Sequence, residues 1–114
     1  MRHDVRKSER HPIWGMAALV GDRESLVGQV VNISGTGIAL NLNHDRNASG
    51  SLRNTWLCRV VSPDFPETLE FVAKVVRRYA TTRGSGVGCT IAAINDKDMA
   101  MIDDFQRRRR SLEH

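Results

Sequence analysis

Hydrophobic and polar residues alternate with a period of two over most of this chain, and turn residues divide the alternating segments. The clearest segment is 38–42, where Ile38, Leu40 and Leu42 alternate with Ala39 and Asn41. One face of such a strand is buried and the other faces water. Similar segments are predicted at about 13–20, 26–33, 52–61, 69–79 and 86–91. Six strands, give or take one, predict a mainly β domain with an antiparallel barrel.

The hydrophobic period changes near the carboxyl end of the chain. Met99, Ile102 and Phe105 fall at helical spacing, which predicts an amphipathic helix. Asn95 is a favourable N-cap, and Asp98 follows three residues later, where its carboxylate can accept a hydrogen bond from a free backbone amide. We therefore expect one carboxy-terminal helix that closes over one side of the barrel.

The chain of 114 residues is long enough for one domain with a single modest core. Residues 1–11 are polar and charged without an apolar period, which predicts a flexible basic arm. The barrel and its helix are expected over residues 12–110. Residues 111–114 form a tail that looks like the stub of an expression tag.

Composition favours a soluble protein in the cytoplasm. The chain is 40% hydrophobic and 26% charged, and no apolar run approaches the roughly 20 residues that a membrane-spanning helix needs. Its charged beginning differs from a secretory signal. Cys58 and Cys89 stand alone in apolar stretches, so we expect them to pack in the core rather than to bind metal.

Positive charge gathers at both ends of the chain. The formal net charge is +4, with one basic cluster in residues 2–10 and another in residues 107–110. Such clusters indicate an anionic partner, which could be a nucleotide, a nucleic acid or an acidic protein surface.

Two short motifs occur together. The first is Arg6-x-x-x-Arg10 in the arm, and the second is Asn32-x-Ser34-x-x-Gly37 at the junction of two predicted strands. With these motifs in this order and at this spacing, the chain resembles the PilZ family, whose signature is R-x-x-x-R followed by [DN]-x-S-x-x-G. The resemblance implies a six- to seven-stranded barrel with a carboxy-terminal helix. It also implies a receptor for cyclic di-GMP that needs no cofactor and has no enzymatic activity.

The residue types suit this ligand on physical grounds. An arginine presents a planar fork of donors that matches the O6/N7 edge of guanine, and it can also stack on a base or bind a phosphate. The family contacts are carried over to Arg6, Arg10, Asn32, Ser34 and Gly37. Asparagine stands at position 32, where the family more often has aspartate, so the contacts there need not be identical.

Three residues near the motifs are secondary candidates for the site. Lys7 lies between the two arginines, and His11 follows the second one. Gly35, like Gly37, is expected to permit a positive φ and a close approach of ligand to the backbone. Arg77 and Arg78 are further candidates for the border of the pocket, although a solvated strand end is an alternative for both.

Other functions weigh less. We find no H-E-x-x-H, Walker loop or nucleophile elbow that would indicate an enzyme. A nucleic-acid-binding barrel usually presents exposed aromatic residues, which are scarce in this chain. A third alternative is a PilZ-fold adaptor that binds only protein.

The resemblance also predicts a mechanism. The arm is expected to be mobile without ligand and to close over it when ligand binds. The chain would be a monomer or a weak homodimer and would signal through an unknown protein partner in motility, exopolysaccharide production or biofilm formation.

Overall fold

The computed structural model describes residues 9–42, 54–82 and 84–112. The elements follow one another as β1 (His11–Pro12), β2 (Met16–Val20), β3 (Ser25–Ile33), β4 (Gly37–Leu42), β5 (Thr55–Val61), β6 (Leu69–Thr81), β7 (Gly84–Ala93) and α3 (Asp96–Leu112). The alternation in the sequence therefore predicted the strands from β2 to β7 to within a few residues. It did not predict β1, which has only two residues.

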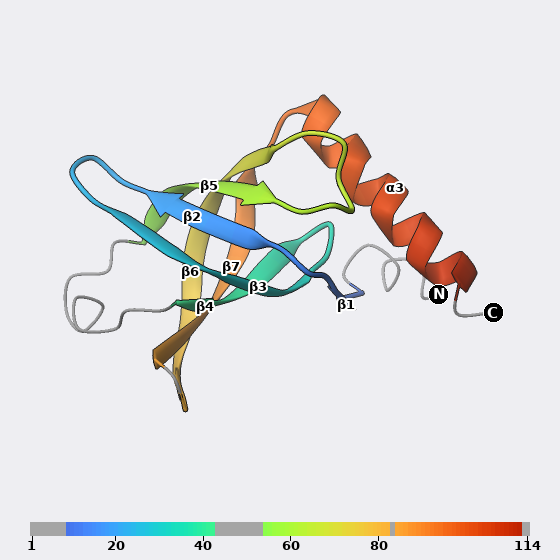
Figure 1. The fold of residues 1–114 in the computed structure, drawn as a ribbon. Helices are drawn as coiled ribbons and strands as arrows, with labels where there is room; N and C mark the ends of the chain where they lie inside the picture. Colours follow the sequence, from blue (N-terminus) through green and yellow to red (C-terminus); the bar gives the residue numbers. More distant parts are fainter. Residues whose placement is uncertain (1–8, 43–53, 83, 113–114) are drawn as a thin grey trace.

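The strands form one closed sheet in which every pairing is antiparallel (Figure 1). The strand order is β1-β3-β2-β5-β6-β7-β4, and an additional pairing between β3 and β4 closes the barrel. β1 and β2 lie one after the other along the same edge of β3. The predicted barrel with one carboxy-terminal helix is confirmed.

Inward-facing side chains fill the barrel. Ile33, Leu40, Leu19 and Val87 have no exposed surface, and Trp56 is 2% exposed. Alternate residues of each strand supply this core because successive side chains point to opposite faces of a sheet. No helix in the described parts of the chain is long and apolar enough to cross a membrane.

Both cysteines belong to this core, as predicted. Cys58 and Cys89 are free thiols that are almost completely buried. Burial, reinforced by the nearby Cys89, raises the pKa of the Cys58 thiol to about 12. Both thiols are therefore kept protonated near neutral pH, where they act as small apolar side chains.

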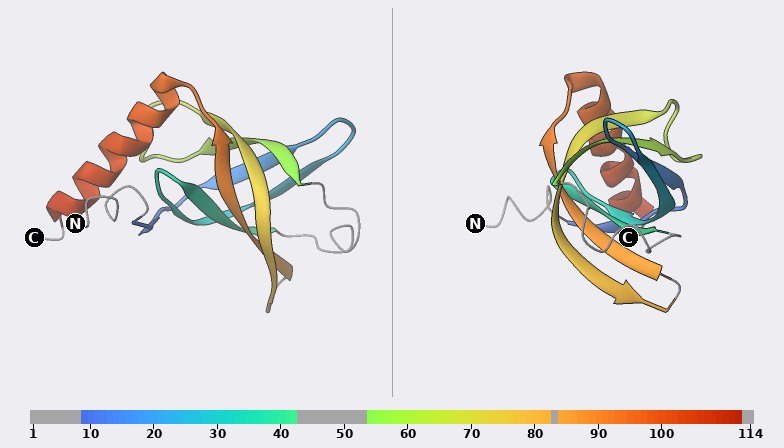
Figure 2. Two further views of the ribbon diagram at one scale, coloured as in Figure 1. Left: turned by 180° about the vertical axis from the view of Figure 1, so that it is seen from behind. Right: turned by 90° about the vertical axis from the view of Figure 1, so that its left-hand side faces the viewer.

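Helix α3 lies across one end of the barrel (Figures 1 and 2). Its buried stripe consists of Asp98, Met101, Ile102, Phe105 and Gln106. The stripe includes Met101 where the sequence pattern had favoured Met99, which is only half-buried.

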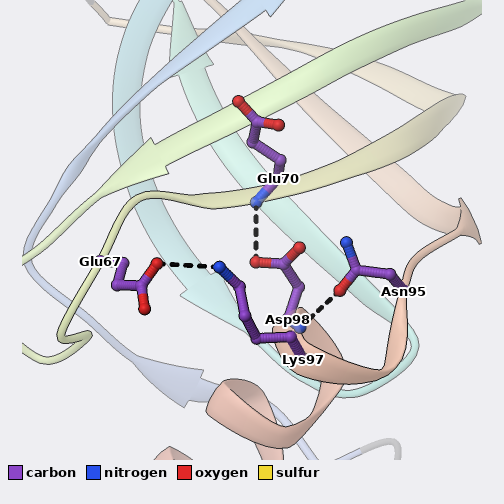
Figure 3. Close-up of polar contacts among 5 residues, drawn as sticks. All are labelled: Glu67, Glu70, Asn95, Lys97 and Asp98. Atoms are coloured by element: carbon purple, nitrogen blue, oxygen red, sulfur yellow. Dashed lines mark hydrogen bonds and ion pairs between the residues drawn. The ribbon is translucent and has the colours of Figure 1, made fainter.

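The start of α3 is fixed by side-chain hydrogen bonds (Figure 3). Asn95 is the N-cap, as predicted, because its Oδ1 accepts a hydrogen bond from the amide of Asp98 at 2.8 Å. The Asp98 carboxylate, however, accepts a hydrogen bond from the amide of Glu70 in β6 at 3.4 Å. Lys97 Nζ donates to Glu67 Oε1 at 2.9 Å. The buried Asp98 thus ties the helix to the barrel.

Candidate functional site

The two sequence motifs meet at one corner of the barrel. In the pairing of β1 with β3, His11 lies opposite Ile33 and Pro12 lies opposite Asn32. This register brings Arg10, the residue before β1, alongside the end of β3. Arg10 Nη1 donates a hydrogen bond to Asn32 Oδ1 at 3.1 Å, across 22 positions of sequence. The short strand β1 is therefore the element that carries the arm's arginine to the strand-junction motif.

Ser34 shapes the turn between β3 and β4. Its side chain is fully buried, and its Oγ accepts hydrogen bonds from the amides of Thr36 at 3.1 Å and Gly37 at 3.2 Å. The Ser34 amide also donates to the Gly37 carbonyl at 2.9 Å. These bonds satisfy polar groups of a buried turn. Ser34 thus stabilises the turn from its buried side, whereas the side chain of Asn32 is partly exposed.

Gly37 lies where three segments of the chain come very close together. A Cβ at this position would overlap the carbonyl oxygen of Cys89 in β7 and would lie 3.0 Å from Arg10 Nη2. Only a hydrogen fits there. The sequence had favoured a positive φ at Gly35 and Gly37, and this interpretation is wrong, because neither glycine has one. Close approach of neighbouring backbone and of the Arg10 guanidinium explains the glycine at position 37.

We expect Gly37→Ala to lower the free energy of unfolding by about 2 kcal/mol, because the methyl group forces β4 and β7 apart or displaces Arg10. Chemical denaturation measures this loss. Gly88→Ala is the matched control, since the nearest atoms to its Cβ position are at 3.7 Å, which is ordinary contact. Equal stability of the Gly37 variant and the wild type would contradict the steric explanation.

The positive charge of Arg10 acts on its surroundings. Burial raises the pKa of the Cys89 thiol to about 11, and the charge of Arg10 opposes this rise. Among the described residues, no carboxylate lies within ion-pair distance of Arg10. Arg10 is exposed, and within the described residues the polar contact of its guanidinium is the one with Asn32.

The residues on either side of Arg10 are anchored to helix α3. Gln106 Nε2 donates to the Glu9 carbonyl at 3.0 Å, and Arg109 Nη2 donates to the Pro12 carbonyl at 2.8 Å. Arg110 Nη1 lies 3.8 Å from Glu9 Oε1. Residues 9–12 therefore form a segment with two sets of contacts, one to the corner and one to the helix. We call it the anchor segment.

His11 points inward from the anchor segment. It is 2% exposed, and its ring lies edge-on to Phe105 of α3 with a centroid distance of 6.2 Å. The structure thus places this secondary candidate beneath the helix rather than on the surface of the corner. The candidates Arg6 and Lys7 lie outside the described residues. The predicted arm extended to residue 11, and the structure begins β1 at that residue.

Sequence reasoning missed the helix residues that hold the anchor segment. Gln106 and Arg109 lie 97 positions from their partners, Glu9 and Pro12. The available signal was a glutamine on the apolar side of the predicted helix, one residue after Phe105. A polar side chain at such a place needs a partner when it is buried.

Comparison with protein families agrees with this geometry. The family model described as PilZ domain matches residues 4–107. The chain belongs to the PilZ domain family. A search of curated protein sequences gave no match.

Solved structures share the fold. The inhibitor of motility of Bacillus subtilis (MotI/DgrA) is 19% identical with a TM-score of 0.72, over 90% of this chain and 50% of that one. This chain thus spans half the length of that relative. The PilZ domain of YcgR from Escherichia coli with c-di-GMP is 10% identical, with a TM-score of 0.59, over 94% of this chain and 97% of that one. The PilZ domain of CeSA from a cellulose-synthesizing bacterium is 16% identical, with a TM-score of 0.58, over 94% and 100%.

Proposed function

We propose that this chain is a cyclic di-GMP receptor without enzymatic activity and that the ligand binds at the corner formed by Arg10 and Asn32. The observation that carries the proposal is the hydrogen bond from Arg10 Nη1 to Asn32 Oδ1 at 3.1 Å. This contact joins the two halves of the family signature on one face of the barrel. Arg6, Lys7, Ser34 and Gly37 stay candidates for the same site.

The chemistry of the corner suits a guanine nucleotide. The planar fork of Arg10 can donate to the O6/N7 edge of guanine or to a phosphate. Asn32 uses its Oδ1 to accept from Arg10, which leaves its NH₂ group to donate to the ligand. An aspartate at this position would have no donor. We infer that Asn32 positions Arg10 and adds one donor to the site.

Isothermal titration with cyclic di-GMP tests the proposal, with single-stranded DNA titrated in the same salt as a comparison. The expected result is saturable binding of cyclic di-GMP and none of the oligonucleotide. Binding of the oligonucleotide alone would favour the nucleic-acid-binding barrel, and binding of neither would favour the adaptor. Either outcome would overturn the proposal.

The anchor segment gives the receptor a route for its signal. Arg10 lies on the ligand side of this segment, whereas Glu9 and Pro12 are held by Gln106 and Arg109. A ligand that moves the backbone at Arg10 would also change the contacts of Glu9 and Pro12 with the carboxyl half of α3. We propose that a protein partner senses this half of the helix, in a process such as control of motility, exopolysaccharide production or biofilm formation in the cytoplasm.

Replacing Gln106 with alanine is expected to uncouple the helix from the site. In wild-type protein, ligand should shift the NMR signals of residues 9–12, 32–37 and 105–110. In Gln106→Ala the shifts at 105–110 should be reduced by about half, because one of the two hydrogen bonds from the helix to the anchor segment is lost. Arg107→Ala, on the exposed side of the same helix, is the control. Unreduced shifts in the Gln106 variant would contradict the route.

An adaptor function is the second candidate, and one surface favours it. The outer face of β2 and β5, with the residues just before β2, exposes Trp14 (70%), Met16 (44%) and Val61 (63%). Met16 and Val61 are directly paired across the two strands. Exposed apolar side chains in one place indicate contact with another protein. A partner on this surface is compatible with ligand binding at the corner.

A further inference from the structure

A row of residues crosses the outside of the barrel from the proposed site to strand β6. Asn32 in β3 is paired with Ala39 in β4, Ala39 with Gly88 in β7, and Gly88 with Arg77 in β6. Directly paired residues share one face of a sheet. The neighbouring row, Ile33–Ile38–Cys89, is buried in the core. The row from Asn32 to Arg77 therefore faces outward.

Arg77 lies over the glycine with which it is paired. The position that a Cβ would take on Gly88 is 3.7 Å from both Cβ and Nε of Arg77. At the other side of the row, Arg10 Nη2 lies 3.0 Å from the position that a Cβ would take on Gly37. Gly37 is two residues before Ala39, the partner of Gly88. The two arginines thus lie over glycines of adjacent strands.

Tyr79 supports Arg77 on the side away from Arg10. It is paired with Gly86, and its ring lies against that glycine, where any Cβ would overlap it. The Arg77 guanidinium carbon is 5.4 Å from the centroid of the Tyr79 ring, a cation–π distance. This contact limits the directions that the Arg77 side chain can take. The guanidinium is held close to the sheet.

Among the described residues, the outer row between the two arginines has no side chain larger than a methyl group, and it is little exposed, since Ala39 is 7% exposed and Gly88 is buried. Its middle consists of Ala39 and Gly88. Within the described ranges, neither Arg10 nor Arg77 lies within ion-pair distance of a carboxylate. The two guanidinium groups border opposite sides of this row, so an anionic ligand placed across it would be attracted to both.

We propose that Arg77, supported by Tyr79, forms the second wall of the cyclic di-GMP site and contacts the guanine or phosphate farther from Arg10. This inference rests on the proposed function and extends it across the barrel. From β3 to β6 the row spans three strand spacings, about 14 Å along the sheet. That span suits a ligand with two bases at its ends. Arg77 would stack its planar guanidinium on the far base, while the small residues of β4 and β7 allow the ligand to lie close to the sheet.

A pair of adjacent arginines provides the test. Arg78 is paired with Val87, which is fully buried, so Arg78 lies on the opposite face of β6 from Arg77. Arg77→Ala and Arg78→Ala remove the same charge from neighbouring positions. By calorimetry, we expect Arg77→Ala to weaken cyclic di-GMP binding roughly fivefold or more and Arg78→Ala by less than about twofold. Thermal unfolding checks that both variants keep the fold.

The outcomes separate this inference from the proposed function. If wild-type protein does not bind cyclic di-GMP, the proposed function fails. If the wild type binds and the two variants have equal affinities, the second wall is refuted and the proposed function stands. Arg77→Lys, which keeps the charge and loses the planar group, should stay weakened. If Arg77→Lys binds cyclic di-GMP as tightly as the wild type does, the proposed stacking of Arg77 on the base is wrong.

Discussion

Replacing Arg10 with alanine is expected to weaken the binding of cyclic di-GMP at least about tenfold, because a charged hydrogen-bond donor to the ligand contributes about 1.5–3 kcal/mol. Arg10 is exposed, and its one polar contact in the part of the chain that the structure describes is with Asn32. The barrel should therefore fold without it. Isothermal titration gives the affinity, and a thermal melt shows whether the fold is kept.

Arg23→Ala is the control for general loss of positive charge. Arg23 is an exposed residue in the turn between β2 and β3, at the far end of the barrel from β1 (Figure 1). Its variant should bind as the wild type does. Unchanged affinity of the Arg10 variant would remove this arginine from the site, and equal losses in both variants would show that only net charge matters.

Replacing Phe105 with alanine should cause the largest loss of stability, about 3–5 kcal/mol in the free energy of unfolding. Phe105 has no exposed surface. Its ring contacts Phe65 at a centroid distance of 5.6 Å and His11 at 6.2 Å, so it joins the helix, the β5–β6 connection and the anchor segment. A cavity at this place loosens all three. Urea denaturation measures the change.

Leu112→Ala provides the comparison for the same helix. Leu112 is 77% exposed, and its truncation should change stability by less than about 0.5 kcal/mol. A loss below about 1 kcal/mol in the Phe105 variant would show that α3 contributes little to the stability of the barrel. Reduced affinity for cyclic di-GMP in this variant at low temperature, where it is still folded, would link the helix to the site.

The alternation of hydrophobic and polar residues was enough to predict the barrel, because each long strand has one buried and one solvated face. In β5, for example, Trp56, Cys58 and Val60 are buried while Leu57 and Arg59 are exposed. The same signal could not reveal β1, since two residues have no period. Its position depends on pairing with β3, which is a tertiary interaction.

The conjunction of the two motifs indicated the corner, and the contact between Arg10 and Asn32 agrees with it. Sequence could not show that the hydroxyl of Ser34 is turned into the β3–β4 turn, because the same side chain on a regular strand would share a face with Asn32. The direction of a side chain at a strand end depends on local hydrogen bonds that the pattern does not contain.

Sequence alternation also could not predict which of Arg77 and Arg78 lies on the outer face of the barrel. Simple alternation from the inward-facing Val75 would turn position 77 inward and position 78 outward. The pairing of β6 with β7 shifts register between Val75 and Arg77, so the extra residue, Val76, reverses the two faces. Arg77 then lies on the outer row with Gly88. A bulge leaves no clear mark in the sequence of a single strand.

The double attachment of the anchor segment has a thermodynamic consequence that works in both directions. In the proposed receptor, this segment contacts Asn32 through Arg10 and α3 through Glu9 and Pro12, so binding events at the corner and at the helix would share one free energy of coupling. Under this proposal, a partner protein that binds Gln106 or Arg109 would change the nucleotide's dissociation constant by the same factor by which the nucleotide changes the partner's. The nucleotide concentration at which the proposed receptor responds would then depend on the concentration of its partner.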